Sequence, residues 1–172
     1  MMNCGTLKIM VDTNVWLSYF EGNSEYAADT VALFDELSAM KAAVYAASSS
    51  LKDVYYLHQR DMKKSLYASG LAITKQLAAG VRESSWSCVR SMMELAMIVP
   101  IGQAEALRAT TLRELHNDFE DDLILAAADR IQADYLVTTD KRLTKHAPVA
   151  CLCPADMIAL LRARAQASEE AE

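Results

Sequence analysis

The sequence predicts an α/β fold with a mostly parallel sheet of four to five strands, covered by helices on both faces. Short apolar runs alternate with longer helical segments along the whole chain, and strands joined through helices run parallel. The chain has 172 residues, 52% of them hydrophobic, which is enough to bury one core. No linker and no internal repeat interrupts it. We therefore expect a single domain over residues 1–172.

Five apolar runs are the predicted strands, and each ends at polar, turn or capping residues. They are Leu7 to Val11, Ala43 to Ala47, Met97 to Ile101, Tyr135 to Thr138 and Val149 to Leu152. In a parallel sheet of this kind, ligands collect outside the carboxyl ends of the strands. Polar residues directly after a strand are therefore the first candidates for a functional site.

The segments between the strands have helical composition. The predicted helices are Asn14 to Phe20, Ser24 to about Met40, a long helix from the serines at 48–50, a helical region from Asp61 to Ala96 with breaks at Gly70 and Gly80, Ala104 to Leu115, Asp118 to Ile131, and Ala155 to Arg164. Ser24 and the serines at 48–50 offer N-caps, and Pro154 suits a helix start. The polar tail, 166–172, is expected to fray.

Composition narrows the function classes. No apolar run reaches the roughly 20 residues of a membrane span, the first residues lack a signal-peptide pattern, and the four cysteines form no framework, so we expect a cytoplasmic protein. The net charge of −6 argues mildly against a protein that coats nucleic acid. Arg60, Lys63 and Lys64 nevertheless cluster in one predicted helix, a pattern typical of a solvated face.

Acidic residues follow or precede the strands so that they converge on one rim. Asp12 follows the first strand, Asp140 follows the fourth, and Asp118, Glu120, Asp121 and Asp122 open the helix before the fourth. Carboxylates brought together repel one another unless a cation neutralises them. Oxygen ligands favour Mg²⁺ or Mn²⁺, and such an ion suits phosphodiester hydrolysis.

Helix geometry suggests which acid of this cluster faces inward. Three, four and seven positions after Asp121 come Ile124, Leu125 and Ala128, an apolar stripe, whereas the stripe that follows Asp122 is mixed. We therefore predict that Asp121 is the ligand. Asp118 and Asp122 are expected to act as outer or capping groups, with Asp122 bordering solvent.

These residues resemble the motifs of PIN-domain ribonucleases. The resemblance rests on Asp12-Thr13-Asn14-Val15 after a strand, on the segment Asp118 to Leu123 with the alanines at 126–128, on Tyr135 to Leu143, and on Cys153-Pro154-Ala155-Asp156 before an apolar helix. It spans nearly the whole chain in order, although the middle third matches only as generic helix.

The resemblance implies a three-layer α/β/α sandwich and a Mg²⁺- or Mn²⁺-dependent endoribonuclease. Carried over residue by residue, Asp12, Asp121 and Asp140 would be metal ligands. The remaining family acid is usually a Glu after the second strand, and the matching position here is Asp53, one methylene shorter. Many family members are dimeric toxins silenced by an antitoxin, so the implied partners are RNA, an antitoxin and a second copy of the chain.

Neighbouring polar groups are candidates for supporting roles. Thr13 and Asn14 could orient Asp12 or a substrate phosphate, or cap the helix that follows. Thr138 and Thr139 could similarly support Asp140 or end the strand, and Thr139 is the one selected for the support set. Trp16, together with Tyr19 and Phe20, could stack on unpaired bases, although aromatic residues at helical spacing are more often core.

Two other functions remain open at this point. The first is a phosphatase-like enzyme with Asp12 as nucleophile, but Asn14 stands where such enzymes typically carry a second Asp. The second is a catalytically weakened PIN-like interaction module, which the shorter Asp53 and the acidic net charge favour.

Overall fold

The fold is a five-stranded parallel sheet between helices. We describe a computed structural model of the chain over residues 6–22, 24–114 and 118–169. The strand order is β3-β2-β1-β4-β5, and every neighbouring pair is parallel. The strands are β1 (Lys8–Val11), β2 (Ala43–Ala47), β3 (Met97–Val99), β4 (Tyr135–Val137) and β5 (Cys151–Leu152). The predicted fold class is confirmed.

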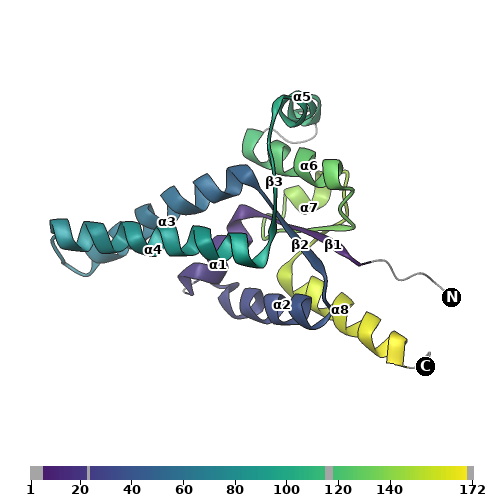
Figure 1. The fold of residues 1–172 in the computed structure, drawn as a ribbon, viewed down its shortest axis with the longest axis horizontal. Coiled ribbons are helices and arrows are strands. Elements are labelled where there is room, and N and C mark those ends of the chain that lie inside the picture. The colour runs from purple at the N-terminus through teal and green to yellow at the C-terminus, as the bar shows by residue number, and fades with distance from the viewer. Residues whose placement is uncertain (1–5, 23, 115–117, 170–172) are drawn as a thin grey trace.

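Eight helices occur within the part of the chain that the structure describes, and they alternate with the strands (Figure 1). They are α1 (Thr13–Glu21), α2 (Ala27–Ala39), α3 (Ser48–Ala68), α4 (Lys75–Leu95), α5 (Gln103–Leu112), α6 (Phe119–Ile131), α7 (Leu143–His146) and α8 (Pro154–Glu169). Among the described residues, no helix is both long enough and apolar enough to cross a membrane.

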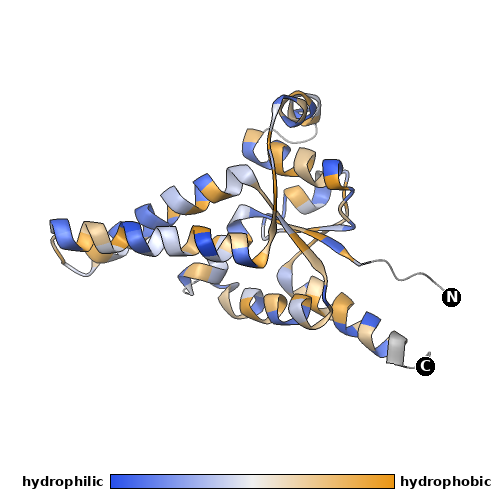
Figure 2. Cartoon of the chain, in the orientation of Figure 1, coloured by the Kyte–Doolittle hydropathy of each residue, from blue (hydrophilic) through white to orange (hydrophobic). Residues whose placement is uncertain are grey.

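The sheet divides the core into two clusters. On one face Ile9 and Val11 pack with residues of α1, α2, α3, α4 and α8, and on the other face Met10 packs with residues of α5, α6 and α7. Figure 1 shows α5, α6 and α7 on one side of the sheet and α2 and α8 on the other. The central strands are mainly apolar (Figure 2), as expected for a sheet covered on both faces.

Strand register sets the position of the site. Val11, the last residue of β1, is paired with Val137, the last residue of β4. The residues that follow, Asp12 and Thr138, therefore leave neighbouring strands side by side. The register explains why a buried strand can end on a carboxylate, since the next strand supplies a polar neighbour at the same level.

Several local predictions were wrong. Helix α4 continues through Gly80, where a break was predicted, because its apolar residues Val81, Val89 and Met92 are buried against the core and outweigh the low helix propensity of one glycine. Helix α2 begins at Ala27 without a side-chain cap, so Ser24 is not its N-cap. Helix α8 extends to Glu169 and so enters the predicted tail.

The aromatic residues after Asp12 belong to the core. Trp16 is fully buried, and its ring lies 4.7 Å from that of Phe34 and 6.2 Å from that of Phe20. Tyr19 also contacts Phe34, at 4.7 Å. Trp16 thus has no surface on which a base could stack, and of the two interpretations of these aromatics the structure favours packing.

Candidate acidic site

Asp12 ends β1 and caps the helix that follows. Its Oδ1 accepts a 2.6 Å hydrogen bond from the N–H of Thr13, the first residue of α1. Only 2% of the residue is exposed. A short strand leading directly into a helix thus places one carboxylate at the carboxyl edge of the sheet, held by the first turn of α1.

The hydroxyl of Thr138 links Asp12 to the end of β4. Thr138 is fully buried, and its Oγ1 donates to Asp12 Oδ2 at 2.7 Å. The same oxygen accepts from the N–H of Asp140 at 3.0 Å and from the side-chain amide of Asn14 at 3.4 Å. One hydroxyl therefore connects two of the predicted site acids.

Asn14 completes this network from α1. Its Oδ1 accepts from the backbone N–H of Thr139 at 3.2 Å, while its Nδ2 donates to Thr138. Asn14 thus joins the first turn of α1 to the segment after β4. Thr139 takes part through its backbone, whereas the side chain that supports both acids is that of Thr138. Sequence reasoning named both threonines and selected Thr139 for the support set, because only the register reveals which one faces Asp12.

Asp140 lies at the outer edge of the network. Its Oδ1 accepts from the backbone N–H of Arg142 at 2.7 Å, and its Oδ2 lies 3.7 Å from the Arg142 guanidinium. The Arg142 side chain is 77% exposed, so this ion pair is worth little. The carboxylate is held mainly by the turn that follows β4.

The acidic start of α6 brings a third carboxylate to the same place. Asp118 caps the helix by accepting from the N–H groups of Glu120 and Asp121, which confirms its predicted capping role. The negative charges of Asp12 and Asp140 both act on Asp121, so the side chains of β1, β4 and α6 are close enough to interact.

The prediction that Asp122 borders solvent was wrong. Asp122 is 1% exposed, whereas Asp121 is partly exposed. Helix α5 packs against α6, as the 2.9 Å hydrogen bond from Arg108 to Asp129 indicates, and Asp129 lies on the same helical face as Asp122. The single-helix pattern could not reveal this neighbour. The same pattern correctly predicted that the helix face that starts at Asp121 continues with buried apolar residues, namely Ile124, Leu125 and Ala128.

The electrostatics of the site are those of crowded acids. Burial and, to a lesser extent, the charge of Asp140 raise the pKa of Asp12 to about 6, against the lowering effect of the Thr138 and Thr13 hydrogen bonds. Burial also raises the pKa of Asp121 to about 7, with the charges of Asp12, Asp118, Asp140 and Asp122 adding to it. Near neutral pH the pocket therefore accepts protons or another positive charge.

Helix α3 closes the site on the β2 side. The Thr13 hydroxyl donates to Ser50 Oγ at 2.8 Å, which ties the first turn of α3 to the first turn of α1. Asp53, three residues further along, is 8% exposed, and its Oδ1 lies 2.8 Å from the ammonium group of Lys52. Its hydrogen bond with Asp53 raises the pKa of Lys52, as does the charge of Glu120 on α6. Asp53 thus lies one turn beyond the contact of α3 with α1, and its carboxylate is paired with Lys52.

The donor set fits a hard divalent cation by its chemistry, since it offers oxygen atoms only, and burial and neighbouring charges raise the pKa values of Asp12 and Asp121. As the side chains stand, however, no group of three or more His, Cys, Asp or Glu among the described residues is arranged closely enough to hold an ion. The hydrogen bonds explain the difference. Asp12 directs both oxygens at Thr13 and Thr138, Asp140 is turned to Arg142, and Asp53 is paired with Lys52. Hydrogen bonds of this kind satisfy carboxylates when no ion neutralises them.

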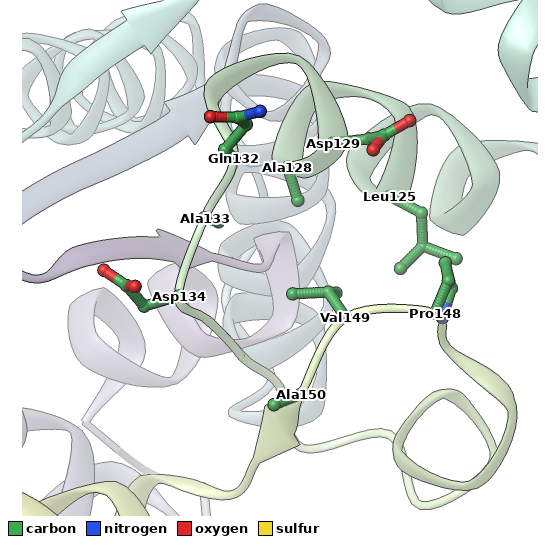
Figure 3. Close-up of a pocket in the computed structure, with 9 residues that line it drawn as sticks. All are labelled: Leu125, Ala128, Asp129, Gln132, Ala133, Asp134, Pro148, Val149 and Ala150. Carbon is green, nitrogen blue, oxygen red and sulfur yellow. The ribbon is translucent and has the colours of Figure 1, made fainter.

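A separate cavity of about 370 Å³ lies at the opposite end of β4 and β5 (Figure 3). Its walls are mostly Ala128, Ala133, Val149 and other small or aliphatic side chains. The carboxylates of Asp129 and Asp134 point in opposite directions there. Asp134 accepts from the backbone N–H of Lys8 and so anchors the start of β1. This cavity brings no reactive groups together.

Two further residues of the site were not predicted as such. Ser50 was expected to cap α3, but it contacts Thr13 instead. Lys52 carried no prediction, and the signal that could have identified it is its position directly before the acid of α3.

Cys151 lies in β5, where burial, followed by the charge of Asp12, raises the pKa of its thiol to about 12. A thiol of that kind stays protonated and is no nucleophile.

Comparison with protein-family models gives a match to the PIN domain over residues 8–142. No curated protein matches the sequence. The matched segment begins at the first residue of β1 and ends just beyond Asp140, so it contains every acid described above.

Solved structures give the same fold at low sequence identity. A structure of VapBC2 from Rickettsia felis bound to a DNA fragment from its promoter matches with a TM-score of 0.58 and 16% identity, covering 86% of this chain and 98% of that one. A sarcin-ricin loop cleaving toxin, VapC20 of Mycobacterium tuberculosis, matches with a TM-score of 0.59 and 12% identity, covering 80% and 93%. A protein from Pyrobaculum aerophilum matches with a TM-score of 0.58 and 14% identity, covering 95% of this chain and 96% of that one.

Proposed function

Because this chain belongs to the PIN-domain family, we propose that it is a metal-dependent endoribonuclease and the toxin of a toxin–antitoxin pair. One observation carries the nuclease proposal. Asp12, Asp121 and Asp140 come from three separate segments of the chain, the charge of Asp140 raises the pKa of Asp12, and the charges of both raise the pKa of Asp121. The toxin proposal is supported by the names of the solved neighbours, and the cytoplasm is the corresponding place of action.

The proposed ligands of the ion are Asp12, Asp121 and Asp140, with Asp53 as a fourth acid of the site. Bound Mg²⁺ or Mn²⁺ would supply a water of lowered pKa and neutralise charge on the RNA phosphate. The chain's own residues do the rest. Thr138 holds Asp12 and the backbone of Asp140 in register, Thr13 joins α1 to α3, and Asn14 fixes the segment after β4.

The direct test combines cleavage with metal removal. We expect purified protein to cut RNA in Mg²⁺ or Mn²⁺, to stop in EDTA, and to recover when the ion is restored. Asp12→Asn should lower cleavage by at least about a hundredfold while the thermal melt stays cooperative. Arg90→Gln, at an exposed position on α4, is the matched control. An Asp12→Asn variant that cuts at the parent rate would refute the assignment.

One specific observation favours a second candidate, the interaction module with a weakened site. The Lys52–Asp53 ion pair occupies the fourth acid with a protein cation. A calorimetric Mn²⁺ titration separates the two functions, because a module without a working site would bind no ion. The phosphatase alternative loses its support with the PIN match, and trapping with a phosphate analogue would expose it.

The partner proposals need separate tests. A small DNA-binding protein encoded next to this gene would support an antitoxin, and co-expression should then silence cleavage. The size of the particle in solution, measured by light scattering, tests the proposed homodimer. The extent of the single domain, residues 1–172, also stays a proposal, since the family match covers residues 8–142.

A further inference from the structure

Helix α3 carries an exposed stripe of alternating basic and aromatic side chains. Its members are Lys52, Tyr56, Arg60, Lys63 and Tyr67, spaced four, four, three and four residues apart. At 3.6 residues per turn this spacing keeps all five on one face, over a length of about 22 Å. We call these five residues the α3 stripe.

The α3 stripe faces solvent along its length. The side chains of Lys52 and Arg60 are 61% and 65% exposed, and Tyr56 and Tyr67 are 64% and 66% exposed. Lys63 is partly exposed. Figure 1 shows α3 and α4 side by side as an arm that projects from the sheet. The other side of α3 is occupied, since Val54 and His58 are buried there.

The stripe begins at the acidic site. Lys52 pairs with Asp53 and interacts with Glu120 at the start of α6, and it also interacts with Tyr56, one turn further out. A polymer bound along the stripe would therefore reach the acids at the carboxyl edge of the sheet. Lys52 pairs with Asp53 and Arg60 pairs with Asp61, each at 2.8 Å, so RNA phosphates would compete with these two acids for the cations.

A plain solvated face does not explain the tyrosines. Two rings about two-thirds exposed leave apolar surface in water, where charged residues would serve solubility better. Tyr56 is also supported from one side, because its ring meets Tyr55 edge-on at 5.1 Å and Tyr55 lies 4.9 Å from Trp86. An aromatic ring held by its neighbours and open to solvent is suited to stacking on an unpaired base.

We propose that the α3 stripe binds single-stranded RNA next to the scissile bond, with bases stacked on Tyr56 and Tyr67 and phosphates paired with the cations between them. The proposal rests on the nuclease function proposed above and adds a binding surface to it. Duplex RNA should bind more weakly, since its bases are stacked on each other and offer no free face.

The test is fluorescence anisotropy with a labelled, unstructured RNA oligonucleotide, in an Asp12→Asn background that keeps the RNA intact. We expect Tyr56→Ala and Tyr67→Ala each to weaken binding on the order of tenfold, and Tyr56→Phe to bind like the parent. Lys63→Gln should lower the slope of log affinity against log salt by roughly 0.7, the value for one phosphate contact on a single strand. The tyrosine variants should keep the parent slope.

Two control variants match the changes in charge and in apolar surface. Arg90→Gln removes an exposed cation on α4, and Leu107→Ala removes an exposed apolar side chain on α5. Both should bind RNA like the parent. If Tyr56→Ala, Tyr67→Ala and Lys63→Gln also bind like the parent, or if they change only self-association measured by light scattering, the stripe is no RNA surface.

The outcome also separates this proposal from the nuclease function. Binding that depends on the stripe, in a parent protein that never cuts RNA with Mn²⁺, would contradict the nuclease function and leave the stripe in place. If the protein cleaves RNA with Mn²⁺ but none of the three substitutions changes RNA binding, the proposal for the α3 stripe is contradicted and the nuclease function is not.

Discussion

A single hydroxyl connects the two strand-end acids of this protein. The Thr138 hydroxyl donates a hydrogen bond to Asp12 and accepts hydrogen bonds from the backbone N–H of Asp140 and the side-chain amide of Asn14. Its hydrogen bond lowers the pKa of Asp12 against the larger effect of burial. The residue therefore both positions the carboxylates and helps to keep one of them charged.

Replacing this hydroxyl by a methyl group should affect activity through the pKa of Asp12. Thr138→Val keeps the shape but leaves Asp12 Oδ2 and the Asp140 N–H without their partner, at a cost of about 1–3 kcal/mol in unfolding free energy. The pKa of Asp12 should rise further above 6, so the acid limb of the pH–rate profile should move to higher pH. A pH series of cleavage rates in Mn²⁺ and a thermal melt measure the two effects.

Thr138→Ser is the matched control, because it keeps the hydroxyl and should keep the parent pH profile. A Thr138→Val profile identical to that of the parent would show that the hydroxyl does not act on the reacting groups. A valine variant with a lower melting temperature but an unmoved profile would indicate a purely structural role.

A residue of the site can be predicted from the sequence when the local pattern fixes the direction in which its side chain points. Asp12 and Asp140 could be predicted, because a residue that follows a buried strand must lie at the edge of the sheet. Thr138 could not be separated from Thr139, because the choice depends on how Val11 and Val137 pair across the sheet. The burial of Asp122 likewise could not be predicted from the pattern of α6 alone, because α5 packs against that helix.

At the scale of elements, α3 carries Asp53, the fourth acid of the proposed site. Asp53 is buried and lies one turn beyond Ser50, which touches Thr13, yet its carboxylate is paired with Lys52. An aspartate reaches one methylene less far than the glutamate usual in the family. The first turn of α3 is therefore placed correctly for the site, while its side chain is directed at a neighbouring cation.

Lengthening this side chain should strengthen the site. We expect Asp53→Glu to bind Mn²⁺ more tightly than the parent, and Asp53→Asn to bind it more weakly, each on the order of tenfold. The longer side chain of Asp53→Glu brings its carboxylate closer to the ion, whereas Asp53→Asn removes one negative charge from the site. Calorimetric titration with Mn²⁺ measures both, and cleavage rates should follow the same order.

Asp129→Asn is the control for loss of one carboxylate, since Asp129 lies at the far end of α6 and pairs with Arg108. Equal Mn²⁺ affinity in the parent and both Asp53 variants would remove Asp53 from the site. It would then be only a partner of Lys52 at the start of α3.

The helices show what sequence pattern can predict at this scale. Five strands and their order along the chain were predicted, because apolar runs that end at turn residues are a strong local signal. Helix limits were less accurate. The ends of α2 and α8 and the continuity of α4 through Gly80 depend on packing against the sheet, which a local pattern does not contain.

At the scale of the whole molecule, the parallel sheet is what concentrates negative charge. Parallel strands send their carboxyl ends to one edge, so acids that are far apart in sequence meet there, and the layers of helices on both faces bury Asp12 fully and Asp121 in part. Burial is accordingly the largest cause of the raised pKa values of Asp12 and Asp121. The fold itself therefore makes folding stability depend on pH and on cations.

The sign of this dependence follows from the direction of the shifts. Both acids bind protons more tightly in the folded state, so their contribution to stability is complete below the unfolded pKa near 4 and is lost as pH rises through about 6 to 7. For Asp12 the shift from 3.8 to about 6 corresponds to about 3 kcal/mol. In EDTA the melting temperature should therefore fall between about pH 5 and about pH 8, by roughly 6–12 °C for this term in a chain of this size.

A divalent cation should reverse that fall, because it stabilises the charged form of the acids only in the folded state. We expect Mn²⁺ to raise the melting temperature strongly at about pH 8 and hardly at about pH 5, where protons already neutralise the site. Asp12→Asn, which cannot ionise, should lose much of the pH dependence in EDTA and most of the Mn²⁺ effect, and at about pH 8 without metal it should melt no lower than the parent.

Thermal melts of the parent, Asp12→Asn and Arg90→Gln over this pH range measure all three effects. A Mn²⁺ effect that is equal at both pH values, or equal in the parent and Asp12→Asn, would mean that the ion binds elsewhere and that the carboxylates do not form its site.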